Sequence, residues 1–188
     1  RFLGGGIYAL LAGLRKTDVL YCPLPLYHTV GGVMCVKAVL RSGATLALAR
    51  RFSASRFWDD VALHGATAFQ YVGELCRYLV NQPPHPLERR HALRFALGNG
   101  LRPDVWKIFQ ERFGVPHIVE FYGATESNVA MVNLRGPIGS VGRPPPGLAT
   151  ALVRFDVERA EVVRGPDGRC QACDPGEPGE LLGRITEG

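Results

Sequence analysis

Residues 93–122, "LRFALGNGLRPDVWKIFQERFGVPHIVEFY", contain the pattern that decides the fold. The apolar runs 93–98 and 117–122 have the length and composition of buried strands. Between them, Pro103 suits the first turn of a helix that reaches Phe113, and Gly114 suits its C-terminal end. The segment therefore predicts a strand, a helix and a second strand, which is the repeating unit of a parallel sheet covered by helices.

The same alternation extends toward the N-terminus. Strands are predicted at 19–24, 45–50 and 67–72, and helices at about 2–14, 29–41, 53–64 and 74–81. Ser53 suits the N-cap of the helix that follows it. Because the connections are short, the predicted fold class is α/β, with a parallel sheet layered between helices on both faces.

Near residue 135 the character of the sequence changes. The stretch "RGPIGSVGRPPPG" is dense in Gly and Pro, and the residues after it alternate apolar and polar side chains around the turn "GPDG". We therefore predict an α/β part over 1–134 and, over 135–188, the start of a separate unit of antiparallel β-hairpins.

Composition narrows the class of protein. The 188 residues are 46% hydrophobic, which is typical of a globular protein and excludes disorder and collagen. No apolar run approaches the roughly 18 residues of a membrane span. The charge of +5 is scattered, so it favours small anionic ligands over nucleic acid. The chain starts at Arg1 and stops within a strand-like pattern, so we expect a piece of a longer protein.

The five cysteines are an odd number and do not form a disulfide framework, which indicates a reducing compartment. Cys170 and Cys173 form one CxxC pair without the further ligands that a zinc site needs. A structural feature of a hairpin is the favoured interpretation of this pair, and a metal module is the alternative. We expect a protein of the cytoplasm or of the cytosolic face of a membrane.

Unusual residues follow three of the predicted strands, in "PLYH" (25–28), "GNG" (98–100) and "YGATE" (122–126). Ligands of parallel sheets bind at the carboxyl ends of the strands, where loops form the surface. These three loops are therefore the candidate binding site.

The stretch "YGATE" suits a nucleotide with magnesium. Tyr122 offers a flat face to a base, and Gly123 lets a ligand approach the backbone. Thr125 can donate to a phosphate oxygen, and Glu126 can hold a hard cation. The alternative is purely structural, with a tyrosine in the core, a glycine turn, a threonine helix cap and a solvated glutamate.

The other two loops also have two interpretations. Gly98 and Gly100 around Asn99 either form a turn with positive φ or leave a wall without side chains against a purine or an acyl chain. His28 either lines a carboxylate pocket or is hydrogen-bonded within its loop.

Taken together, these stretches resemble the adenylate-forming acyl-CoA synthetase superfamily, and in particular its fatty acid transport protein branch, the very-long-chain acyl-CoA synthetases. The resemblance rests on "LPLYHTVGG", "FSASRFWDD", "YVGELCRYLVNQPP", "ALGNGLR", "EFYGATESN" and "GPDGRCQACDPGEPGELLGRI". "YGATE" alone indicates only the superfamily, whereas "FSASRFWDD", "YVGELCRYL" and "ALGNGLR" indicate the branch. The likeness covers nearly the whole chain.

The resemblance implies a reaction in two steps. A fatty acid carboxylate attacks the α-phosphate of ATP, and coenzyme A then displaces AMP from the acyl-adenylate. ATP, Mg²⁺ and coenzyme A are the implied cofactors and co-substrates, and a fatty acid is the implied partner. Alternatives are a binding or transport protein of the same fold without chemistry, and a ligase for a bile, aryl or amino acid.

The resemblance also implies roles for single residues. Thr125 would contact the α-phosphate, Glu126 would hold magnesium, and Glu120 would face the adenine amine. The implied nucleotide wall consists of Gly98, Asn99, Gly100, Glu120, Phe121, Tyr122, Gly123 and Thr125.

The implied acyl pocket has His28 at its carboxylate end and Val72 and Gly73 along its wall, where a glycine would leave room for a long chain. Ordinary packing between strand and helix is the alternative for Val72 and Gly73. The family's phosphate loop would precede Arg1, and its catalytic lysine would follow Gly188. This piece alone is therefore expected to be inactive, and any membrane association is expected to come from segments outside it.

Overall fold

The structure is a computed structural model that describes residues 13–124 and 127–185. Its contacts divide the described chain into two compact units. The first contains the residues up to Tyr122 together with Val132–Arg143, and the second contains Gly123–Met131 and the residues from Pro144 onward. The division into domains at residue 134 stays a prediction.

A six-stranded sheet in the order β2-β1-β3-β4-β5-β6 forms the centre of the fold. The pairs β1–β2, β1–β3, β3–β4 and β4–β5 are all parallel, which confirms the predicted parallel sheet. The strands are β1 (Val19–Cys22), β2 (Thr45–Leu48), β3 (Ala68–Val72), β4 (Phe95–Asn99), β5 (His117–Gly123) and β6 (Ala130–Asn133).

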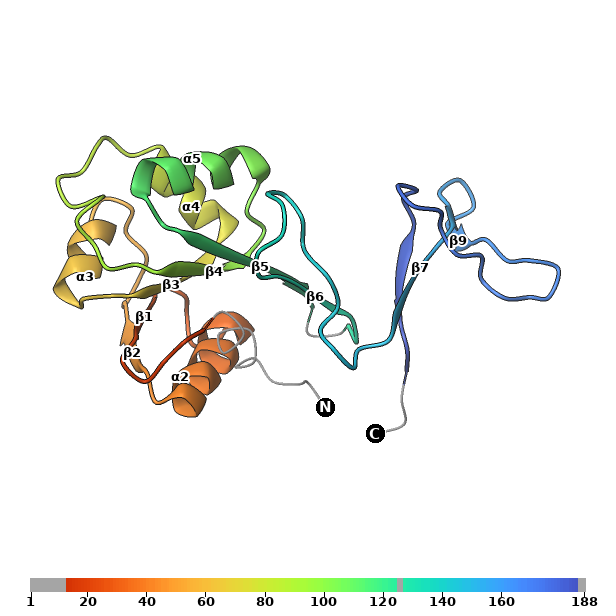
Figure 1. The fold of residues 1–188 in the computed structure, drawn as a ribbon, viewed down its shortest axis with the longest axis horizontal. Helices are drawn as coiled ribbons and strands as arrows, with labels where there is room; N and C mark the ends of the chain where they lie inside the picture. Colours follow the sequence, from red (N-terminus) through yellow and green to blue (C-terminus); the bar gives the residue numbers. More distant parts are fainter. Residues whose placement is uncertain (1–12, 125–126, 186–188) are drawn as a thin grey trace. The chain divides into compact units, whose positions relative to one another are not determined.

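Helices cover both faces of this sheet, with α4 and α5 on one side and α2 on the other (Figure 1). Side chains of successive residues in a strand point to opposite faces of the sheet, and in β3 both faces are packed. The Phe69 ring packs against Phe57 with centroids 4.7 Å apart, whereas Gln70 accepts a hydrogen bond from Cys35 at 3.5 Å. The helices are η1 (Thr29–Cys35), α2 (Val36–Ser42), α3 (Phe57–Leu63), α4 (Gly73–Val80) and α5 (Pro103–Phe113).

Two helix starts differ from their predictions. The helix predicted from Ser53 begins at Phe57 with Arg56 at the N-cap, because the Ser53 hydroxyl contacts Ser55 at 3.3 Å instead of a helix N–H. The helix predicted from Thr29 starts as the π-helical segment η1. The helix predicted over 2–14 lies almost entirely outside the described residues.

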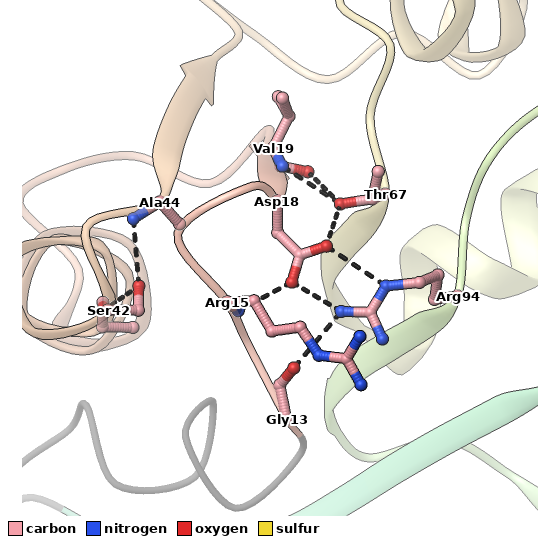
Figure 2. A network of polar contacts seen from close by, with 9 residues as sticks. Gly13, Arg15, Asp18, Val19, Ser42, Ala44, Thr67 and Arg94 are labelled. Carbon is pink, nitrogen blue, oxygen red and sulfur yellow. Dashed lines mark hydrogen bonds and ion pairs between the residues drawn. The ribbon is translucent and has the colours of Figure 1, made fainter.

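An ion pair between the buried Asp18 and the partly exposed Arg94 ties the first unit together at the amino ends of the strands (Figure 2). Asp18 is 3% exposed and accepts from Arg94 Nε at 3.1 Å and Nη2 at 2.5 Å, from the Thr67 hydroxyl at 2.8 Å and from the Arg15 N–H at 2.7 Å. Burial alone would raise the pKa of Asp18. The hydrogen bonds from Arg94, Thr67 and Arg15, with the Arg94 charge, outweigh it and hold this pKa below its usual value.

We expect Asp18→Asn to lower the free energy of unfolding by about 2–3 kcal/mol at neutral pH, because it leaves Arg94 without its carboxylate. The folded-state pKa of Asp18 is depressed. Its stabilisation is therefore present above the ordinary carboxyl pKa of about 4 and is lost as the pH falls through the folded value. Denaturant unfolding of the full-length protein at several pH values should show the two proteins converging in acid.

Asp104→Asn is the matched control, since Asp104 and its partner Arg102 are 60% and 70% exposed. Its unfolding should stay close to that of the wild type. Equal losses for the two variants would contradict the role assigned to Asp18.

The second unit contains short antiparallel strands, as predicted. β7 (Thr150–Val153) pairs with β10 (Glu180–Gly183), and β8 (Phe155–Asp156) pairs with β9 (Glu161–Val162). An antiparallel bridge between Arg164 and Cys170 closes the predicted turn at "GPDG". In neither unit does a described helix have the length and apolar character needed to cross a membrane.

Candidate functional site

The carboxyl ends of β3, β4 and β5 bring most of the predicted site residues side by side. Tyr71 of β3 is in register with Gly98 of β4, and Gly98 is in register with Glu120 of β5. One position further, Val72 lies opposite Asn99. Thr125 and Glu126, to which the resemblance gives the phosphate and magnesium roles, lie outside the described residues.

Glu120 is a buried carboxylate, only 4% exposed. Its Oε2 accepts a hydrogen bond from the Tyr71 hydroxyl at 2.5 Å, and its Oε1 accepts one from the Leu101 N–H at 3.1 Å. Burial raises the pKa of Glu120, and the hydrogen bonds from Tyr71, Leu101 and Gly100 oppose that rise. The carboxylate therefore ties β5 both to β3 and to the loop after β4.

Sequence reasoning missed Tyr71 as part of this site. One signal was available, because a tyrosine inside a buried strand needs a hydrogen-bond partner for its hydroxyl. Which residue supplies that partner depends on the register of three strands, and the sequence does not show the register.

The two glycines of "GNG" have different surroundings. A Cβ atom at Gly98 would overlap the Tyr71 carbonyl oxygen and lie 2.6 Å from ring atom Cε2, so the Tyr71 ring already covers this glycine. Gly98 is buried beside this ring, and its contact with a nucleotide stays a prediction. Gly100 is exposed and has φ +75°, and a Cβ atom added to it would have no described atom within 4 Å. The turn with positive φ and the open surface are both at Gly100.

Asn99, between these glycines, has an unsatisfied acceptor. Its Oδ1 is buried and has no hydrogen-bond partner in the part of the chain that the structure describes. A buried polar atom without a partner costs free energy, which a ligand donor would recover. Asn99 is therefore a candidate contact for a bound molecule.

Gly73 begins α4 directly after Val72. A Cβ atom here would overlap the carbonyl oxygen of Gly100 and lie 2.9 Å from the Leu101 nitrogen. This close approach agrees with the alternative considered from the sequence, ordinary packing between strand and helix, because backbone atoms of the neighbouring loop occupy the space of a Cβ atom. Contact of Val72 or Gly73 with an acyl chain stays a prediction.

The end of β5 exposes an aromatic ring. Phe121 is 6% exposed and packs into the core, whereas Tyr122 is 47% exposed, so the alternative that Tyr122 is a core residue does not hold. Among the described atoms, a Cβ atom at Gly123 would meet only the Val129 oxygen at 3.8 Å, so close packing against them does not require this glycine. The Tyr122 ring is available to stack on a planar ligand.

His28 lies in the loop after β1 and is exposed. Its Nδ1 accepts a hydrogen bond from the Val30 N–H at 3.2 Å and caps η1. The proton of the neutral ring is therefore on Nε2, which is left as a donor. This geometry matches the loop hydrogen bond considered from the sequence, and the carboxylate role of His28 stays a prediction.

The family profile described as "AMP-binding enzyme" matches residues 5–185 of the chain. This match decides the family. The chain belongs to the AMP-binding enzymes.

Curated relatives of this AMP-binding enzyme agree with the branch that the sequence resembles. Long-chain fatty acid transport protein 3 of Homo sapiens is 46% identical over 186 residues, covering 97% of this chain and 27% of the relative. Long-chain fatty acid transport protein 5 of Mus musculus is 49% identical over 179 residues, with 93% and 26% covered. A medium/long-chain-fatty-acid–CoA ligase of Mycobacterium tuberculosis is 47% identical over 173 residues, with 92% and 29% covered. The chain thus spans little more than a quarter of the length of these relatives.

Solved structures confirm the α/β fold of this AMP-binding enzyme. A benzoate CoA ligase from Burkholderia xenovorans LB400 is 25% identical with a TM-score of 0.70, covering 90% of this chain and 33% of that one. ATP-bound MatB from Rhodopseudomonas palustris is 22% identical with a TM-score of 0.73, covering 93% and 34%.

The residues at the strand ends fit a nucleotide. The unpartnered Asn99 oxygen suits a donor, the open surface at Gly100 suits a flat ring, and the half-exposed Tyr122 ring suits stacking. Among the residues that the structure describes, no three His, Cys, Asp or Glu side chains gather into a metal site. Glu126, to which the resemblance gives the magnesium role, lies outside those residues.

Proposed function

We propose that this chain is the central part of the large domain of a long-chain or very-long-chain fatty acid–CoA ligase that uses ATP. The observation that carries the proposal is the unsatisfied Asn99 oxygen between the Gly100 turn and the β5 end that exposes Tyr122. The printed name of the mycobacterial relative, a fatty-acid–CoA ligase, supports the choice of reaction.

The proposed nucleotide site uses the end of β5. Tyr122 stacks on adenine, with Phe121 and Gly123 shaping the same wall, and the Glu120 carboxylate accepts from the adenine amine. Thr125 donates to the α-phosphate. Glu126 holds magnesium, which neutralises negative charge on the phosphates when it is bound.

The proposed reaction consists of two successive displacements. A carboxylate oxygen of the fatty acid bonds to the α-phosphorus while the bond to pyrophosphate breaks. The coenzyme A sulfur then bonds to the acyl carbon while the bond to the AMP oxygen breaks, and the thiol proton leaves to solvent. The Nε2 proton of His28 orients the carboxylate, and Val72 and Gly73 contact the acyl chain.

Two other functions are carried as alternatives. The transport proteins among the relatives favour a binding or transport role without chemistry. The benzoate CoA ligase with the same fold favours a different carboxylate substrate. Membrane attachment, if the full-length protein has it, is proposed to come from segments outside this chain and to place the protein on a cytosolic face.

Pyrophosphate exchange into ATP tests the proposal in the full-length protein. We expect exchange that depends on fatty acids and strengthens with chain length, with little exchange for benzoate, a bile acid or amino acids. Strong exchange with one of those carboxylates would show that it, and not a fatty acid, is the substrate. Fatty acid uptake by cells in the absence of any exchange would favour the transport role.

A further inference from the structure

A row of three residues crosses the sheet next to the proposed nucleotide site. Tyr71, Gly98 and Glu120 occupy paired positions on the parallel strands β3, β4 and β5. Side chains at paired positions of neighbouring strands point to the same face of a sheet. A side chain at the middle position would separate the outer two, and Gly98 has none.

The missing side chain lets the outer residues of the row meet. The Tyr71 ring lies against Gly98, where a Cβ atom would approach ring atom Cε2 to 2.6 Å. The Tyr71 hydroxyl thereby reaches Glu120 Oε2 at 2.5 Å, across the intervening strand. Tyr71 is fully buried, so water does not replace this donor.

Glu120 also holds the loop after β4. Its second oxygen, Oε1, accepts from the Leu101 N–H at 3.1 Å. The other side of the loop is fixed by Gly73, whose Cα lies against the backbone of Gly100 and Leu101. Both carboxylate oxygens of Glu120 therefore have fixed donors, one in β3 and one in the loop.

We infer that Tyr71 is a positioning residue of the nucleotide site, which orients the Glu120 carboxylate and through it the backbone of residues 99–101. This inference rests on the proposed function. Tyr71 does not touch the nucleotide. Without the Tyr71 hydroxyl, Glu120 keeps only its donors in the loop, Leu101 and Gly100, and a buried carboxylate that has lost a donor reorients or takes up a proton.

Tyr71→Phe in the full-length protein tests the inference, since it removes one oxygen and keeps the ring over Gly98. We expect the Kd for ATP, measured by calorimetry, and the KM for ATP to rise about tenfold. This is the size of one lost hydrogen bond to a charged group, here the proposed bond from the adenine amine to a Glu120 carboxylate that is no longer oriented. The KM for the fatty acid should stay within about twofold.

Tyr21→Phe is the matched control. Tyr21 is 1% exposed, lies in β1 of the same sheet and donates its hydroxyl to a carboxylate, Asp60 Oδ2, at 3.0 Å. This substitution removes the same kind of bond without involving Glu120 or residues 98–101. We expect a comparable loss of stability and an unchanged Kd for ATP.

A double-mutant cycle covers the case in which Tyr71→Phe weakens the protein generally. If Tyr71 acts through Glu120, Tyr71→Phe should have little further effect on the Kd for ATP in a Glu120→Ala background, which has no side-chain acceptor for the Tyr71 hydroxyl. The inference would be overturned if the effects of the two substitutions on the Kd for ATP were additive, or if Tyr71→Phe and Tyr21→Phe had equal Kd values. In either case, ATP binding by the wild-type protein would still support the nucleotide site. A wild-type protein that fails to bind ATP would overturn both.

Discussion

We expect Glu126→Ala to abolish fatty-acid-dependent pyrophosphate exchange in the full-length protein, with a loss of about a thousandfold or more. The proposed reaction builds negative charge on the phosphates, and Glu126 is the proposed magnesium ligand. Exchange measured across a range of magnesium concentrations should show that Glu126→Asp recovers part of the rate at high magnesium, because aspartate keeps the carboxylate on a shorter side chain.

Glu158→Ala provides the control, since Glu158 is an exposed glutamate in the turn between β8 and β9. It should exchange pyrophosphate at the wild-type rate. If Glu126→Ala retained more than about a tenth of the wild-type rate, Glu126 could not be the metal ligand of the proposed reaction. If Glu126→Ala lost exchange but left fatty acid uptake unchanged, transport would not depend on the ligase reaction.

Gly73→Ala is expected to have the second largest effect, with the Kd for ATP rising more than about twentyfold and the free energy of unfolding falling by about 2–3 kcal/mol. The added methyl group would overlap the Gly100 carbonyl, which is backbone and can give way only if the loop moves. Movement of this loop displaces Asn99 and withdraws the Leu101 N–H from Glu120. Calorimetric titration with ATP and denaturant unfolding measure the two effects.

Gly147→Ala is a matched substitution in the second unit. Gly147 has φ +87°, and no described atom lies within 4 Å of the position of an added Cβ. The substitution therefore introduces backbone strain without a steric clash. We expect a loss of about 1 kcal/mol in stability and normal ATP binding. Full ATP affinity in Gly73→Ala would show that the loop adapts and that Gly73 does not fix the site.

Local signals in the sequence were sufficient for most of the fold. α5 has the predicted bounds because Pro103 and the left-handed Gly114, φ 73°, mark its two ends. The apolar runs became parallel strands, since a strand buried on both faces needs a continuous run of such residues. Ser53 misled the prediction because a serine before an apolar run can cap a helix or bond within a loop, and here its hydroxyl contacts Ser55.

The sequence predicted where the candidate site lies, but only part of the packing that shapes it. The loops after β1, β4 and β5 were expected to form the site. The strands β4 and β5 are neighbours in the sheet, whereas β3 separates β4 from β1, the strand before His28. For Gly73, packing between strand and helix was one of two interpretations, whereas the reason for Gly98 could not be predicted. Each depends on an atom from another strand or loop, the Gly100 carbonyl in one case and the Tyr71 ring in the other.

The Tyr71 ring over Gly98 also limits how this region can be redesigned. A side chain at position 98 would meet the Tyr71 ring and also the Tyr71 carbonyl oxygen, which stays in place whatever residue occupies position 71. Position 98 is therefore restricted to glycine by backbone as well as by the ring. Positions 71 and 120 can vary only together, because a residue without a hydroxyl at position 71 leaves Glu120 in need of a new donor, so single-site scanning of either would underestimate the sequences that this sheet can accept.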